Sequence, residues 1–154
     1  MSFSPNLCNI LICGFDERCG FDVVYTLILD LVNNNKLRYF TADEINIVKS
    51  FNFFNIYSHL KHFDYIILCR RNVLSLTTDK TKLHQYIEAY NCWTLFANVI
   101  IPYEDSYQDI YDALYRTFNT LDPIVENDEE HMVLDSKKLI NFMRSNGYEK
   151  QSLI

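Results

Sequence analysis

The sequence predicts an α/β fold in which helices cover both faces of a mostly parallel sheet, that is, a three-layer sandwich. Short apolar runs bounded by polar residues are typical of strands buried on both faces. Amphipathic helical patterns follow these runs at repeats of roughly 30 residues, the size of one strand–helix–strand unit. No linker or internal repeat interrupts the 154 residues, so we expect a single domain over residues 1–154.

The predicted strands are apolar runs, and the predicted helices carry apolar residues three and four positions apart. The first helix stops at three consecutive asparagines, 33–35, which favour a turn. Proline ends the third strand at Pro102, and it ends the most regular helix at Pro123 because it disfavours helix at the preceding residue. The expected strands are 7–15, 64–69 and 95–101, and the expected helices are 23–31, 79–90, 106–121 and a closing helix through 139–143.

Other segments allow less definite interpretations. Thr41 and Glu44 have the spacing of a helix capping box, and Ile45 with Val48 would continue that helix. The aromatic stretch 51–57 fits either an edge strand or a packed loop. Further short strands could form at 36–40 and at 123–125 or 131–134, and the helix at 79–90 is expected to turn Leu83, Tyr86, Ile87 and Tyr90 inward.

Glycine is scarce, and this excludes the common phosphate-binding loops. Only Gly14, Gly20 and Gly147 are available, whereas a phosphate cradle uses several close glycines to bring backbone N–H groups to the ligand. In the loop 14–22 the glycines are six apart rather than five, and Phe21 and Asp22 stand where a P-loop needs Lys and Ser or Thr. We therefore expect no P-loop nucleotide site.

The charges after the predicted strands also disfavour nucleotide binding. Asp16, Glu17 and Asp22 would repel a polyphosphate at a cost of a few kcal/mol per pair at an effective dielectric constant of about 20. Segment 70–71 after the second strand offers no carboxylate for magnesium, and segment 102–105 lacks the Asn-Lys-x-Asp of a guanine-specificity loop. Three strand ends thus lack the residues of nucleotide chemistry.

No catalytic, cofactor-binding or metal-binding set is expected. His59 and His62 could share a helix face, but two surface histidines are the simpler interpretation. Cys69 stands beside two arginines that would lower the pKa of its thiol, although an inert core thiol is the more common case. A pocket lined by Cys69, Arg70 and Glu104 would instead indicate an enzyme.

The apolar surface points to protein partners. Trp93 is the sole tryptophan and is expected at a corner between a helix and a strand, either half exposed as an interface anchor or buried as a plug. We predict a partner-binding surface around Trp93 and the closing helix, with Leu139, Phe142 and Met143 as its apolar side chains.

Charge and cysteine content set the expected class of partner and compartment. The net charge of −6 gives no basic field for direct nucleic-acid binding, and no apolar run approaches the roughly 18 residues of a membrane span. Five cysteines without a C-x-x-C pair indicate a reducing, intracellular compartment.

Several of these segments, in this order, resemble centromere protein M, an inactive relative of small GTPases in the inner kinetochore. The resemblance lies in 9–14 (NILICG), 63–68 (FDYIIL), 71–75 (RNVLS), 96–101 and 139–145 (LINFMRS). It implies a small-GTPase-like topology without bound GTP, a nuclear location at the kinetochore, and docking on the helical-repeat centromere protein I beside centromere proteins H and K. Two alternatives stay open: a small α/β enzyme or flavodoxin-like cofactor binder, and a viral modulator that binds host proteins.

Overall fold

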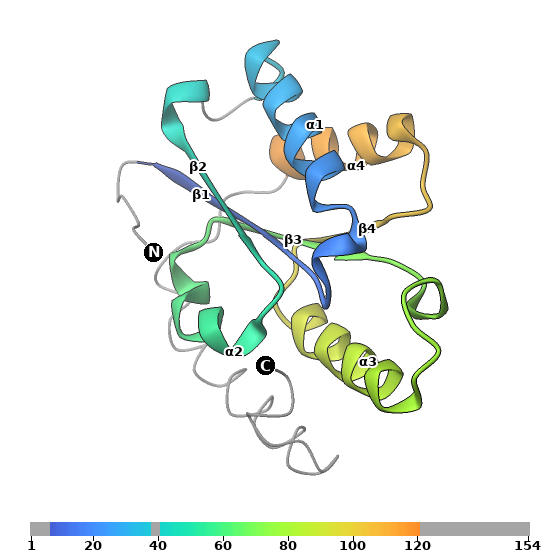
Figure 1. Cartoon of the computed structure of the whole chain (residues 1–154). Helices are drawn as coiled ribbons and strands as arrows, with labels where there is room; N and C mark the ends of the chain where they lie inside the picture. The colour runs from blue at the N-terminus through green and yellow to red at the C-terminus, as the bar shows by residue number, and fades with distance from the viewer. Residues whose placement is uncertain (1–6, 38–40, 121–154) are drawn as a thin grey trace.

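The computed structural model describes residues 7–37 and 41–120, and it shows the predicted three-layer α/β sandwich (Figure 1). Within these residues the middle layer is an all-parallel sheet in the order β2-β1-β3-β4, an arrangement consistent with a small-GTPase-like sandwich. The strands are β1 (Cys8–Cys13), β2 (Ile45–Ser50), β3 (Tyr65–Arg70) and β4 (Val99–Pro102).

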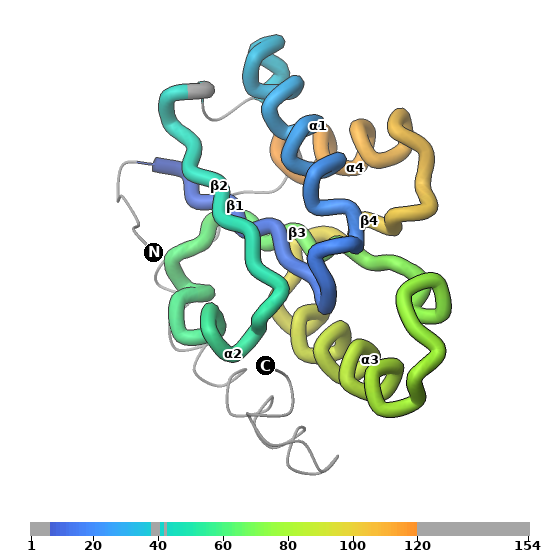
Figure 2. Tube along the Cα trace, viewed as in Figure 1, coloured from blue at the N-terminus to red at the C-terminus, as the bar shows by residue number. Residues whose placement is uncertain are grey.

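Helices cover both faces of the sheet. In the view of Figure 1, α1 (Phe21–Asn33) and α4 (Tyr107–Thr120) lie together above the sheet. Below it lie α2 (Phe53–Ile56), continued by a 3-10 turn over Tyr57–His62, and α3 (Lys80–Thr94). The tube in Figure 2 follows the same two layers and the strand-to-helix crossovers that connect them. Within the described residues no helix has the length and apolar character needed to cross a bilayer.

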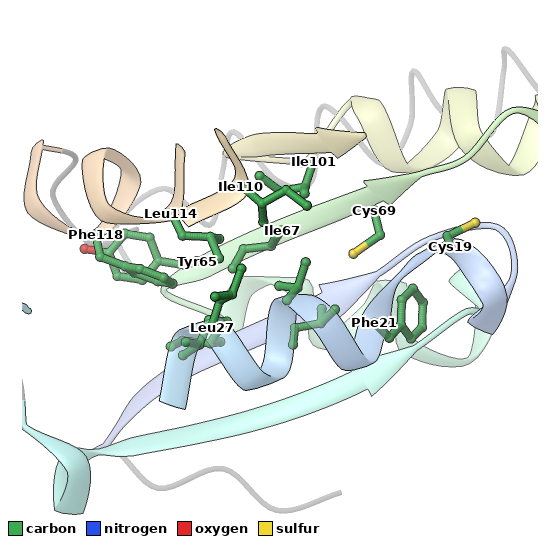
Figure 3. Close-up of a cluster of buried hydrophobic side chains, with 14 of the residues drawn as sticks. Cys19, Phe21, Leu27, Tyr65, Ile67, Cys69, Ile101, Ile110, Leu114 and Phe118 are labelled. Atoms are coloured by element: carbon green, nitrogen blue, oxygen red, sulfur yellow. The ribbon is translucent and has the colours of Figure 1, made fainter. Parts of the chain in front are cut away.

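Each central strand contributes to two separate cores. In β1, Ile10 and Ile12 face α1 and α4, whereas Leu11 and Cys13 face α2 and α3. This alternation follows from the two-residue period of a strand, and it explains why the run is apolar at almost every position. Figure 3 shows the core between the sheet and the helices α1 and α4, which extends from Phe118 to Phe21.

Helix α1 ends at the predicted asparagines, but it begins at Phe21, two residues before the predicted start. Gly20 precedes it at φ 100°, a left-handed conformation that costs glycine little. At the other end Asn35 adopts φ 54°, and the Lys36 N–H donates to the Leu31 carbonyl at 2.9 Å. The asparagines thus satisfy the last carbonyls of the helix and turn the chain toward β2.

The helix predicted after Thr41 is wrong. The capping interaction exists, since the Thr41 N–H donates to Glu44 Oε1 at 3.1 Å, but only one 3-10 turn follows before β2 begins at Ile45. Ile45 and Ile47 pack on the core of α1, whereas Val48 packs on the opposite core. Their β-branched side chains favour the strand, and parallel pairing with β1 stabilises it.

The aromatic stretch 51–57 is neither an edge strand nor a loop. It forms α2 and the start of the following 3-10 turn, and it buries Phe53 and Ile56 against α3. The ring of Phe53 meets the Trp93 indole edge to face, with centroids 4.8 Å apart.

The inward face predicted for α3 is partly wrong. Ile87 is exposed, whereas Glu88, Ala89, Cys92 and Trp93 are buried. The helix also runs to Thr94, so β4 is shorter than predicted. Of the possible strand at 36–40, residues 36–37 form no regular structure and residues 38–40 lie outside the described residues. The alternative last strands at 123–125 or 131–134 and the closing helix with Gly147 also lie outside them.

Candidate functional site

The carboxyl ends of the strands are the place to look for a site, because parallel α/β folds bind ligands where the strand order reverses. Here β2 lies on one side of β1, whereas β3 and β4 lie on the other side, so the strand order reverses at β1. The loop 14–20, between β1 and α1, lies at this reversal. It is the position that a phosphate loop would occupy.

The backbone of β3 and the ring of Phe21 crowd the start of this loop. A Cβ on Gly14 would lie 2.9 Å from the Cys69 carbonyl oxygen and 3.0 Å from the Phe21 ring, so only glycine fits. Phe21, which stands where a P-loop has its lysine, is 5% exposed. Figure 3 shows its ring beneath the loop, near Cys69. An aromatic ring therefore packs where a cation would meet a phosphate.

Asp16 is the centre of a hydrogen-bond network that ties the loop to α3. Its Oδ1 accepts from the Arg18 N–H at 2.8 Å and from Arg18 Nε at 2.9 Å, and its Oδ2 accepts from Arg18 Nη2 at 3.0 Å. The Tyr86 hydroxyl donates to the same Oδ2 at 2.8 Å. Mainly because of the side-chain bond from Arg18, the pKa of Asp16 falls from 3.8 to about 2.

Arg71 ties the same loop to β3 and β4. Its Nη1 donates to the Arg18 carbonyl at 2.9 Å, and its Nε donates to Ser75 Oγ at 3.2 Å. The guanidinium also stacks on the Tyr103 ring, 4.0 Å from the centroid. That ring in turn lies 3.1 Å from the place a Cβ on Gly20 would take.

At Arg18 the loop therefore presents a hydrogen-bond acceptor, whereas a phosphate cradle presents donors. A phosphate cradle aims backbone N–H groups at an anion, whereas here a backbone carbonyl accepts from a cation of the same chain. Asp16, one of the three carboxylates predicted to repel a polyphosphate, is already paired with Arg18. Glu17 is exposed, and Asp22 is 98% exposed and meets Lys49 at 3.5 Å.

A half-open cavity lies beside the loop, toward β2. Its volume is about 520 Å³, and Lys49 above the Tyr25 ring at 4.3 Å flanks it. The lining residues are Glu17, Arg18, Phe21, Asp22, Lys49 and Phe51. The charged residues that line the cavity are of both signs. Among the described residues, no group of three or more His, Cys, Asp or Glu side chains is placed to hold a metal ion.

Of the two interpretations of Cys69, the structure supports the inert core thiol and not a thiol with a lowered pKa. Burial raises the pKa of the Cys69 thiol, with a smaller contribution from Cys19. Arg70 is exposed, and Glu104 Oε1 accepts from the Asn72 N–H at 2.8 Å instead of facing the thiol. These residues are not among those that line the cavity beside the loop.

Of the four residues predicted to bind a partner, the structure describes only Trp93. Trp93 is fully buried against Phe53 and Phe96, so it is the plug rather than the half-exposed anchor. Its buried indole N–H has no acceptor among the described residues, which is unfavourable because a buried donor normally finds a partner. Leu139, Phe142 and Met143 lie outside the described residues.

Sequence reasoning missed the residues that close the site. Asp16 and Tyr86 are 70 positions apart, and Arg71 and Arg18 are 53 apart, so no local pattern connects them. The one available signal was a pair of arginines, Arg70 at the end of β3 and Arg71 directly after it.

Comparison of the chain with protein-family models, with curated proteins and with solved structures finds no match.

Proposed function

We propose that the protein is a noncatalytic interaction subunit built on a small-GTPase-like sandwich that works without nucleotide. The observation that carries this proposal is the Arg71 guanidinium bonded to the Arg18 carbonyl at 2.9 Å, in the loop that would hold a phosphate. A ligand entering there would have to break the bonds of Arg71 and displace the Phe21 ring. Stabilisation of this edge comes from side chains of the chain itself.

A thermal-shift titration of the full chain tests the absence of nucleotide binding. GTP or GDP with magnesium at submillimolar concentration should leave the melting temperature unchanged. A ligand present at about 100 times its Kd stabilises a protein by about 2.7 kcal/mol, which such a titration detects readily. An active small GTPase treated in parallel is the positive control, and clear stabilisation of this chain would overturn the proposal.

The narrower proposal is a subunit of the inner kinetochore, in the nucleus, that docks on centromere protein I beside centromere proteins H and K. Its support is the resemblance of segments 9–14, 63–68 and 71–75 to centromere protein M. Purified full chain mixed with the complex of centromere proteins H, I and K should elute with it in size-exclusion chromatography. Separate elution would reject the kinetochore assignment and leave the noncatalytic proposal standing.

A cofactor-binding function is the second candidate, because one observation favours it. The order β2-β1-β3-β4 is also that of flavodoxin-like sheets, in which the cofactor binds at the reversal between β1 and β3. Visible absorbance of the purified protein distinguishes the two functions. A flavin spectrum would support the second candidate, and a colourless protein would favour the first.

A further inference from the structure

We propose that an exposed patch at the carboxyl edge of the sheet docks an acidic segment of a protein partner. The patch consists of Arg71, Leu74 and Tyr103 and is called the Arg71 patch below. The partner brings a carboxylate to the guanidinium and apolar side chains to the leucine and the tyrosine ring. This inference rests on the proposed function, for which it names the surface and the chemistry of the partner.

Arg71 is held in place before any partner arrives. Its Nε donates to Ser75, its Nη1 donates to the Arg18 carbonyl, and its plane stacks on Tyr103. A free arginine loses considerable rotamer freedom when it is fixed on binding. Because the contacts within the chain already fix this side chain, binding a partner there costs less entropy.

The charge of Arg71 has no carboxylate partner among the described residues. The ion pairs of this edge are Arg18 with Asp16 and Lys49 with Asp22. The nearby Glu104 carboxylate accepts instead from the Asn72 N–H at 2.8 Å. Nη2 of Arg71 takes part in none of the hydrogen bonds just described, so a fixed, partly exposed guanidinium keeps donors for an incoming oxygen anion.

Two exposed side chains with apolar surface stand near Arg71 at this edge of the sheet. Tyr103 is 43% exposed, and Leu74, in the same 3-10 turn as Ser75, is 64% exposed. Arginine and tyrosine, together with tryptophan, are the residue types enriched at the energetic centres of protein interfaces. Arg70 is also exposed at this edge and adds a second positive charge.

Charge complementarity identifies the partner. A carboxylate can bind two N–H groups of a guanidinium at once, which gives both strength and orientation. A basic segment would place like charges against Arg70 and Arg71 and would be repelled. The patch therefore fits a segment in which aspartate or glutamate stands among leucine or phenylalanine.

The test uses the full chain, labelled with nitrogen-15, and two short capped peptides as probes. One peptide intersperses glutamates with leucines, and the other has lysine at every glutamate. The acidic peptide should shift the amide resonances around Arg71, Leu74 and Tyr103, and the basic peptide should not. Leu74→Glu should weaken binding of the acidic peptide by about tenfold, which corresponds to about 1.4 kcal/mol.

The variants separate docking from folding. Leu74 is exposed, so Leu74→Glu should melt like the wild type, whereas Arg71→Ala also removes bonds within the loop. Lys36→Ala is the matched control, because it removes a positive charge at the other end of α1 and should leave binding unchanged. Failure of the acidic peptide to bind, binding elsewhere, or equal binding of the basic peptide would overturn the inference. A nucleotide-induced thermal shift would instead overturn the proposed function.

Discussion

The carboxylate of Asp16 should stabilise the folded chain, because Arg18 and Tyr86 surround it only in the native state. Its pKa falls from 3.8 to about 2 on folding. At 1.36 kcal/mol per pKa unit, the whole shift would correspond to about 2.5 kcal/mol. Water screens part of this interaction, since the Arg18 side chain is 54% exposed although that of Asp16 is only 14% exposed. We therefore expect Asp16→Asn to lower the free energy of unfolding by about 1–2 kcal/mol at neutral pH.

The pH dependence of this loss follows from the direction of the shift. Because the pKa of Asp16 is lower in the folded state, its contribution is complete above the unfolded value of 3.8. It is lost as the pH falls from 3.8 toward about 2, where the carboxyl group takes up a proton in the folded state as well. The difference between the wild type and Asp16→Asn should therefore be constant near neutral pH and shrink as the solution is acidified.

Urea unfolding at a series of pH values measures this difference. Asp22→Asn is the matched control: it also removes one carboxylate of the loop region, but Asp22 is 98% exposed and meets Lys49 at the long distance of 3.5 Å. It should change the free energy of unfolding by less than about 0.5 kcal/mol. Equal urea midpoints for Asp16→Asn and the wild type, or a difference that does not depend on pH, would refute the argument that Asp16 holds the loop.

Two further predictions concern buried side chains. Trp93→Ala should lower the free energy of unfolding by about 3–5 kcal/mol, because Trp93 is fully buried. Iodide should quench the fluorescence of this sole tryptophan poorly in the native wild type, and ready quenching would contradict its burial. Burial raises the pKa of the Cys13 and Cys69 thiols, and it raises the pKa of Cys19 to about 11 and that of Cys92 to about 12. These four thiols should therefore react with an aromatic disulfide reagent slowly in the native chain and rapidly in urea. Rapid labelling of native Cys69 would support thiol chemistry at the strand end.

The parts of the fold that the sequence predicted are those decided by local pattern and burial. β1 and β3 are apolar at nearly every position because both faces of a central strand are covered. Helix α4 presents Ile110, Leu114 and Phe118 to the core at helical spacing, and the structure places the helix within a residue of the predicted bounds. In these elements the local preference and the tertiary contacts agree.

The segment around Thr41 was mispredicted because two local signals compete there. The capping interaction with Glu44 forms, which is the signal for a helix, yet the following residues pair with β1 from Cys8 to Cys13. Pairing with a strand about 37 positions away contributes more than one turn of helix can. A sequence window around Thr41 does not contain that partner strand, so the outcome could not be read from it.

At the candidate site, the sequence shows that the P-loop motif is absent, but it does not show which bonds stand in its place. The spacing of Gly14 and Gly20 and the residue at Phe21 were enough to predict that a P-loop is missing. The bonds that fill its place join Asp16 to Tyr86 and Arg71 to the Arg18 carbonyl, across three different elements.

These bonds also explain how the loop can keep its shape without a ligand. An empty phosphate cradle would leave backbone donors without an acceptor, which is unfavourable wherever water is excluded. Here Asp16 accepts the Arg18 N–H, and Arg71 satisfies a carbonyl that a cradle would point away from its anion. The stability of this edge should therefore depend on side chains such as Asp16 and not on added nucleotide, so the urea series and the nucleotide titration test one physical argument from opposite sides.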